Sequence, residues 1–237
     1  SATNDGGAGM AQALGAKLLT AEGQQIASGG GALETLARID LSELDSRLAD
    51  CRIDVACDVT NPLTGPQGAS AVFGPQKGAT AQMIDRLDSG LRHYARIIAR
   101  DLDIDVLSLE GGGAAGGMGA ALYAFCGAQL RPGIEIVTDA LQLAERVADA
   151  DLVITGEGRI DSQTIHGKVP VGVARVAKRF NVPVIGIAGS LTADVGVVHQ
   201  HGLDAVFSVI YSICTLDEAL ENAAENVRMT ADRKSVV

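Results

Sequence analysis

Apolar residues recur along the chain at two spacings, which predict helices and strands in turn. Spacings of three and four residues, typical of one helix face, predict long helices over 8–19, 80–100, 138–148, 169–179 and 216–230, and shorter ones over 33–39, 42–48 and near His199. Short β-branched runs predict strands over 52–57, 152–155, 182–188 and 205–210. From about residue 134 the two patterns alternate, which is the signature of a doubly wound parallel sheet.

Length and composition fit this α/β prediction. A chain of 237 residues that is 47% hydrophobic can bury a sizeable core, in one large or two small domains. Aromatic residues make up only 3% of the chain. We therefore expect a core of small aliphatic side chains, as in many α/β enzymes.

Charge and cysteine content narrow the classes of function. The net charge of −10 leaves no broad basic surface for nucleic acid or anionic lipid. No apolar run approaches the roughly 20 residues that span a bilayer. The four cysteines are scattered and form no CxxC pair, so we expect reduced thiols in a cytoplasmic protein without a zinc site. No histidine pair has metal-binding spacing alongside other ligands.

The richest polar segment follows the buried run that ends at Thr155. It contains two carboxylates and two cations, which are Glu157, Asp161, Arg159 and Lys168. Phosphoryl transfer uses such a set, because carboxylates hold Mg²⁺ or accept a proton and cations neutralise phosphate oxygens. The alternative is a solvent-exposed loop whose charges pair among themselves.

A second candidate group follows the predicted strand over 52–57. Asp58 could act as a base or metal ligand there, and Asn61 could fix a substrate hydroxyl or carboxylate. The alternative is a pair of turn-forming residues ahead of Pro62.

Glycine-rich segments provide backbone amides near helix starts. Asn4 and Asp5 precede two glycines, and Gly116 and Gly117 belong to a longer glycine run. Such amides suit phosphate or carboxylate oxygens, although glycine runs also allow close helix packing. Lys77 is a further candidate for an anion. Neither glycine-rich segment matches the sequence pattern of a P-loop or of a dinucleotide-binding fold.

Five motifs in order resemble the class I glycerate kinase family. They are Ser1-Ala-Thr-Asn-Asp-Gly-Gly, Ala56-Cys-Asp-Val-Thr-Asn-Pro-Leu, Gly65-Pro-Gln-Gly-Ala-Ser-Ala-Val-Phe-Gly-Pro-Gln-Lys-Gly, Ala114-Ala-Gly-Gly-Met-Gly and Thr155-Gly-Glu-Gly-Arg-Ile-Asp. The resemblance implies a flavodoxin-like or Rossmann-like doubly wound parallel sheet with a second α/β domain. In this sequence we expect a glycine-rich α/β lobe over 1–131 and the flavodoxin-like lobe over 132–237.

The resemblance also implies a reaction, the transfer of phosphate from ATP, with Mg²⁺, to the 2-hydroxyl of D-glycerate. Asp58 or Asp161 is then the expected base, and Glu157 with Asp161 the expected magnesium ligands. We expect the phosphate or the glycerate carboxylate to bind at Asn4, Asp5, Asn61, Lys77, Gly116, Gly117, Arg159 and Lys168. The hydroxyl that is phosphorylated and the oligomeric state stay open at this point.

The family resemblance leads to one expectation about the gene. Family members have roughly a further third of a chain ahead of the first motif, so we expect more coding sequence before Ser1 and little activity from this segment alone. The alternatives are a non-catalytic nucleotide or organic-acid binding module, and a carboxylate-based hydrolase or oxidoreductase on a similar sheet.

Overall fold

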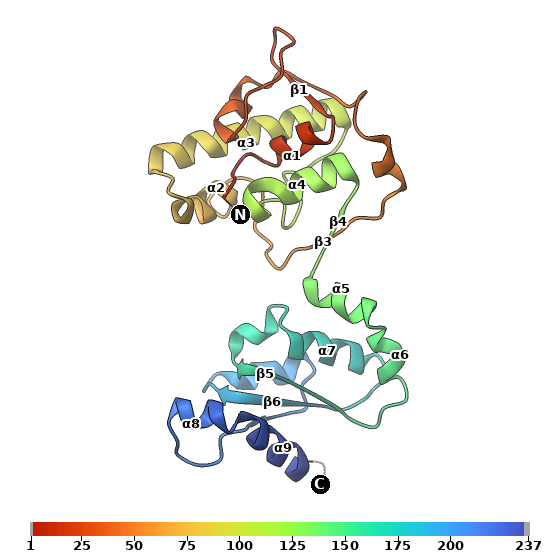
Figure 1. Ribbon diagram of the computed structural model, residues 1–237, viewed down its shortest axis with the longest axis vertical. Coiled ribbons are helices and arrows are strands. Elements are labelled where there is room, and N and C mark those ends of the chain that lie inside the picture. The colour runs from red at the N-terminus through yellow and green to blue at the C-terminus, as the bar shows by residue number, and fades with distance from the viewer. Residues whose placement is uncertain (1, 235–237) are drawn as a thin grey trace. The chain divides into compact units, whose positions relative to one another are not determined.

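The computed structural model describes residues 2–234, which divide into two units between Pro132 and Gly133. Each is described by itself. The first contains α1 (Ala8–Ala13), β1 (Lys17–Leu19), η1 (Gly30–Thr35), β2 (Arg38–Asp40), η2 (Ser46–Asp50), β3 (Asp54–Ala56), α2 (Ala69–Phe73), η3 (Pro75–Lys77), α3 (Ala81–Leu102), α4 (Ala114–Cys126) and β4 (Gln129–Arg131), as Figure 1 shows. Its strands form two pairs, β1 with β2 antiparallel and β3 with β4 parallel.

The long helix α3 organises the first unit. Thr80 caps it, because its side chain accepts a hydrogen bond from the Met83 N–H. Leu91, Tyr94 and Ile98 lie one turn apart and are fully buried. Their stripe packs into a single apolar cluster with residues of η1 and α4.

The predicted helix over 8–19 is wrong in its second half. The helix ends at Ala13, and Lys17–Leu19 form strand β1, in which Leu18 pairs with Ile39. Gly15 has a φ of 99°, and a Cβ there would lie 2.1 Å from the Glu43 carbonyl oxygen. This left-handed glycine ends the helix and turns the chain into the strand.

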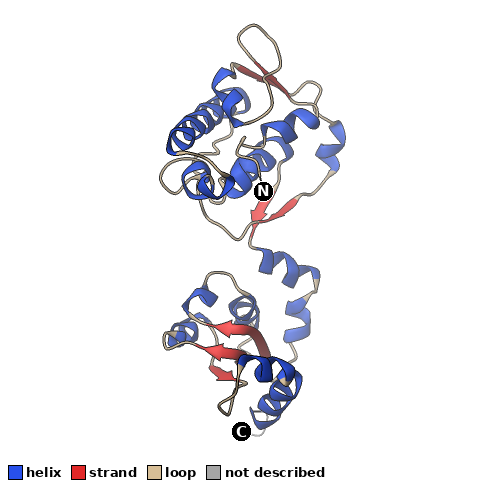
Figure 2. Ribbon diagram, turned by 60° about the vertical axis from the view of Figure 1, so that its left-hand side comes forward, coloured by secondary structure: helices blue, strands red, loops and turns tan. Residues whose placement is uncertain are grey.

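The second unit contains α5 (Gly133–Ala140), α6 (Leu143–Val147), β5 (Val153–Ile160), η4 (Ser162–Ile165), α7 (Val169–Lys178), β6 (Val184–Leu191), η5 (Val195–His201), β7 (Ala205–Ser208), α8 (Leu216–Glu221) and α9 (Ala223–Lys234). Its sheet is parallel with the order β5-β6-β7. Helices lie on both sides of it, with α7 against β5 and α9 against β6 (Figure 2). The predicted α/β class with parallel strands is confirmed.

Several element boundaries in the second unit differ from the predictions, among them the expected helix over 216–230, which divides at Asn222 into α8 and α9. The expected helix over 138–148 is two helices, since Gln142 takes a left-handed conformation with a φ of 52° between α5 and α6. Strand β5 runs to Ile160, whereas the apolar run predicted an end at Thr155. Glu157 and Arg159 therefore belong to a strand and pair with Ala188 and Ser190 of β6.

None of the helices within residues 2–234 combines the length and the apolarity that a membrane crossing requires.

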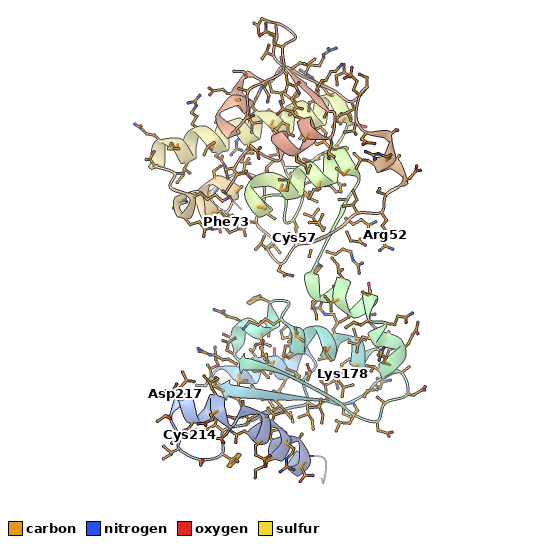
Figure 3. All side chains as sticks on the ribbon, viewed as in Figure 1. Arg52, Cys57, Phe73, Lys178, Cys214 and Asp217 are labelled. Carbon is orange, nitrogen blue, oxygen red and sulfur yellow. The ribbon has the colours of Figure 1, made fainter. Side chains whose placement is uncertain are left out.

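Asp204 holds the start of β6, and its charge makes the stability of the second unit depend on pH. Its carboxylate accepts hydrogen bonds from Lys178 Nζ, labelled in Figure 3, and from the Val184 N–H, both at 2.6 Å. Burial opposes its charged form, but these hydrogen bonds prevail and lower the pKa of Asp204. A lowered pKa stabilises the fold above the unfolded value of about 3.9, and this contribution is lost as the pH falls through the folded value.

We predict that Asp204→Asn lowers the urea midpoint of unfolding at pH 7 and that the difference from wild type shrinks as the pH falls toward about 3. Asp151→Asn is the control, because it removes an exposed carboxylate for which the described residues show no hydrogen bond. An equal loss of stability at both pH values would contradict an electrostatic role for Asp204.

Candidate functional site

The end of β5 carries the first candidate group. Glu157 lies in the strand, Asp161 is the N-cap of the turn η4, and Lys168 is the N-cap of α7. The chain thus passes from a parallel strand through one turn into a helix. In open α/β sheets the carboxyl ends of the strands are where ligands bind, so these side chains stand at the expected place.

A buried threonine joins the two carboxylate residues. Thr164 is fully buried, and its hydroxyl Oγ1 lies 2.7 Å from Glu157 Oε1. The same oxygen accepts a hydrogen bond of 3.1 Å from the Asp161 N–H. Asp161 Oδ1 in turn accepts from the Gln163 N–H at 3.0 Å, and Asp161 and Thr164 together form a capping box. Strand and turn are therefore fixed to each other by side-chain hydrogen bonds.

Both candidate cations pair with Asp161. Lys168 Nζ lies 3.4 Å from Oδ1 and Arg159 Nε lies 3.4 Å from Oδ2. The Arg159 side chain is 63% exposed, so solvent screens this pair and the guanidinium can turn toward an incoming anion. The turn thus gathers the two carboxylates and two cations that the sequence singled out, with both cations close to Asp161; phosphate binding by them stays a prediction.

The residue types at this turn fit magnesium. No group of three or more His, Cys, Asp or Glu that could hold a metal occurs in the described part of the chain. Magnesium commonly takes only one or two carboxylates and fills its other positions with water and substrate phosphates. Glu157 and Asp161 provide such hard oxygen ligands, and one Glu157 oxygen is already oriented by Thr164.

The first unit brings together three other predicted residues around a cavity of roughly 440 Å³. Asn4, Asp5 and Lys77 line it, together with Ala2, Thr3, Ser28, Gly29, Gly30, Gly74, Ala79, Met83 and Leu87. Lys77 Nζ donates to the Thr3 carbonyl at 2.6 Å, and Asn4 Nδ2 donates to Ser70 Oγ at 2.9 Å. The cavity wall therefore combines a cation, Lys77, with apolar side chains such as Met83 and Leu87.

Asp5 and Lys77 have different roles in this cavity. Asp5 is buried, and its two carboxylate oxygens accept from the N–H groups of Gly7 and Gly9 at 3.0 and 3.1 Å. It thereby anchors the start of α1, and ligand binding by Asp5 stays a prediction. Burial lowers the pKa of Lys77, with Asp5 opposing the shift. An anionic ligand would restore part of the lost solvation, so Lys77 is suited to bind a carboxylate or phosphate.

Asp58 and Asn61 follow β3 in the chain, one and four residues after Cys57, which Figure 3 labels. Asp58 is exposed. Asn61 Nδ2 donates to the Gln67 carbonyl at 2.8 Å, and the Asn61 carbonyl accepts from the Gly113 N–H at 3.0 Å. Asn61 therefore shapes its own loop and joins it to the glycine run. Ligand binding by these two residues stays a prediction.

Gly116 and Gly117 serve close backbone packing. Both have positive φ, 74° and 95°, and both are buried inside α4, whose first turn they distort. A Cβ on Gly116 would lie 2.1 Å from the Thr3 carbonyl oxygen, and one on Gly117 would lie 2.5 Å from Gly6 Cα. These glycines let the two glycine-rich segments touch, which places Asn4 and Asp5. Contact of the glycines with phosphate stays a prediction.

Sequence reasoning missed Thr164 and Ser70, which hold candidate residues in place. Thr164 had a detectable signal, since an Asp followed three residues later by a hydroxyl side chain can form a reciprocal cap. Ser70 contacts Asn4 across 66 residues of sequence, and no local pattern reveals such a contact.

Comparisons with known proteins agree on one family. A model described as the glycerate kinase family matches residues 1–235. Glycerate 2-kinase of Escherichia coli (strain K12) is 67% identical over 227 residues, covering 96% of this chain and 60% of that protein. Glycerate kinase of Bacillus subtilis (strain 168) is 57% identical over 231 residues, with 98% and 60% coverage. A crystal structure from Salmonella typhimurium LT2, provisionally assigned as glycerate kinase 2, has 76% identity and a TM-score of 0.81, covering 98% of this chain and 60% of that one.

The packing role of Gly116 can be tested by a matched pair of alanine substitutions. Gly127 also has a positive φ, 63°, but a Cβ there meets nothing within 4 Å. We predict that Gly116→Ala lowers the free energy of unfolding by roughly 2–5 kcal/mol, from strain plus overlap, and Gly127→Ala by about 1 kcal/mol, from strain alone. Denaturant unfolding measures both. Equal losses would show that the contact with Thr3 does not matter.

Proposed function

Because this chain belongs to the glycerate kinase family, we propose that the protein is a glycerate 2-kinase, which transfers the γ-phosphoryl group of ATP to the 2-hydroxyl of D-glycerate. The chain spans 60% of the length of the E. coli and B. subtilis relatives. The observation that supports the proposal most is the turn after β5. It places Glu157, Asp161, Arg159 and Lys168 together at the carboxyl end of a parallel strand.

The proposed roles follow from the charge of each group. Glu157 would hold Mg²⁺, which draws negative charge from the phosphates when it is bound. Arg159 and Lys168, kept beside each other by Asp161, would bind phosphate oxygens, Arg159 with its planar fork. These cations neutralise charge that spreads over the transferred group in the transition state.

The acceptor substrate is a small hydroxy acid in this proposal. Lys77 in its partly desolvated cavity would bind the glycerate carboxylate, and Asn4 and Ser70 would keep the neighbouring loop in shape. Asp161 is held by two cations, and Asp58 is an exposed carboxylate at the end of β3. Either could orient the substrate hydroxyl, so both stay candidates for the base.

We infer three finer properties with the function. The order β5-β6-β7 with helices on both sides supports a flavodoxin-like arrangement of the second unit. All four cysteines have free thiols, which supports a cytoplasmic location. The acidic net charge of −10 supports small-molecule substrates over nucleic acid or membrane partners.

The proposal predicts ligand binding that depends on the metal. We expect the protein expressed from its intact gene to melt at a higher temperature with ATP and Mg²⁺ together than with either alone, because a ligand that binds only the folded state stabilises it. It should also convert D-glycerate and ATP to 2-phosphoglycerate. Glu157→Gln and Asp161→Asn should each lower turnover at least about a hundredfold with little change in melting temperature.

Glu135→Gln is the matched control for these variants. It removes a carboxylate of the same unit that pairs with Arg175 at 3.6 Å on the surface. Its turnover should equal that of wild type. ATP protection without phosphorylation of D-glycerate would favour a nucleotide-binding module. If Glu157→Gln and Asp161→Asn both kept near-normal turnover, the turn after β5 would have only a structural role.

A further inference from the structure

Thr164 occupies a position that the reaction itself does not explain. Its hydroxyl is fully buried, yet both of its hydrogen bonds go to the residues that carry the proposed chemistry, Glu157 and Asp161. We propose that Thr164 is a positioning residue, whose hydroxyl fixes the Glu157 carboxylate in the orientation that binds the metal. This inference rests on the proposed role of Glu157.

The direction of the two hydrogen bonds follows from the donors available. A hydroxyl has one proton and two lone pairs. The Asp161 N–H can only donate, so Thr164 Oγ1 must accept from it. The single hydroxyl proton is then left for Glu157 Oε1, 2.7 Å away. Glu157 therefore accepts a hydrogen bond on one of its two carboxylate oxygens, and the hydroxyl of Thr164 is the donor.

Fixing one carboxylate oxygen limits the freedom of the other. A glutamate side chain loses rotamer entropy when it is ordered, and a ligand that orders it on binding is bound more weakly for that reason. Thr164 orders Glu157 before any ligand arrives. Partners of metal ligands act in this way, and their loss commonly weakens metal binding about 10–100-fold.

The start of the turn that carries Thr164 is itself held by hydrogen bonds. The Asp161 side chain caps η4 by accepting from the Gln163 N–H. Ser162 hydrogen-bonds to Asp194, whose pKa this bond lowers. The hydroxyl therefore has little freedom to move away from Glu157 when the site fills. Its position is set by the fold and not by the ligand.

Three substitutions of Thr164 distinguish the effect of its hydroxyl from the effect of its methyl group. Thr164→Val keeps the shape and removes the hydroxyl, Thr164→Ser keeps the hydroxyl and removes the methyl group, and Thr164→Ala removes both. If Thr164→Val folds poorly, the Ser and Ala pair still differs by the hydroxyl alone. Asp204→Asn is the control for a general loss of stability in this unit.

The measurement is the affinity of the intact protein for Mn²⁺ in the presence of ATP, followed by electron paramagnetic resonance, with Mg²⁺-dependent turnover alongside. We expect Thr164→Val and Thr164→Ala to weaken Mn²⁺ binding about 10–100-fold and to lower kcat, with KM for D-glycerate unchanged. Thr164→Ser should restore the wild-type affinity, and Asp204→Asn should not alter it.

The possible results distinguish the positioning role of Thr164 from the metal-binding role of Glu157 on which it rests. If Glu157→Gln weakens Mn²⁺ binding and Thr164→Val does not, the positioning role is overturned and the role of Glu157 stands. If neither variant changes Mn²⁺ binding, the metal role of Glu157 falls and the role of Thr164 with it. Absence of D-glycerate phosphorylation by wild type would overturn the proposed reaction, while the Mn²⁺ measurement would still decide on Thr164.

Discussion

The hydrogen bond from Thr164 to Glu157 joins the end of β5 to the turn that follows it, and the candidate phosphate site depends on this connection. β6 fixes the strand along its length, through pairs that run from Val153 to Ile160. The turn then presents Asp161, which holds Arg159 and Lys168 beside it. The exposed ion pairs of Asp161 are weak by themselves, and a buried hydroxyl with both hydrogen bonds made fixes the two carboxylate residues relative to each other.

In the first unit the equivalent constraint is steric. Gly116 and Gly117 allow the backbone of α4 to touch residues 3–6, and no side chain larger than hydrogen fits there. This contact, with the Gly6 N–H donating to the Gly116 carbonyl at 2.9 Å, places Asn4 and Asp5 at the cavity of Lys77. A glycine run that suggests phosphate binding thus has a packing role that the structure shows directly.

Some of this organisation could be predicted from the sequence, and the limits have physical causes. Helix α3 follows from a local apolar spacing, so the predicted range of 80–100 lies close to the observed Ala81–Leu102. The end of β5 was placed too early, because Glu157 and Arg159 are polar and their pairing with β6 is a tertiary feature. The break at Gln142 was missed, since a non-glycine residue with positive φ has no strong sequence signal.

The candidate residues also divide into those that the local sequence reveals and those that only the fold brings together. Residue types identified the set Glu157, Asp161, Arg159 and Lys168, because one strand end carries them all. Lys77 and Asn4 lie 73 residues apart in sequence, and only the fold brings them to one cavity. Thr164 was missed because its importance lies in what it contacts and not in its own chemistry.

A crystal structure of the intact protein with Mg²⁺, a non-hydrolysable ATP analogue and D-glycerate tests the central claim most directly. The account predicts that Glu157 contacts the metal or one of its water ligands, with Arg159 or Lys168 on the phosphates and the Thr164 hydrogen bond to Glu157 kept. A bound triphosphate and metal with no contact to residues 156–168 would contradict it.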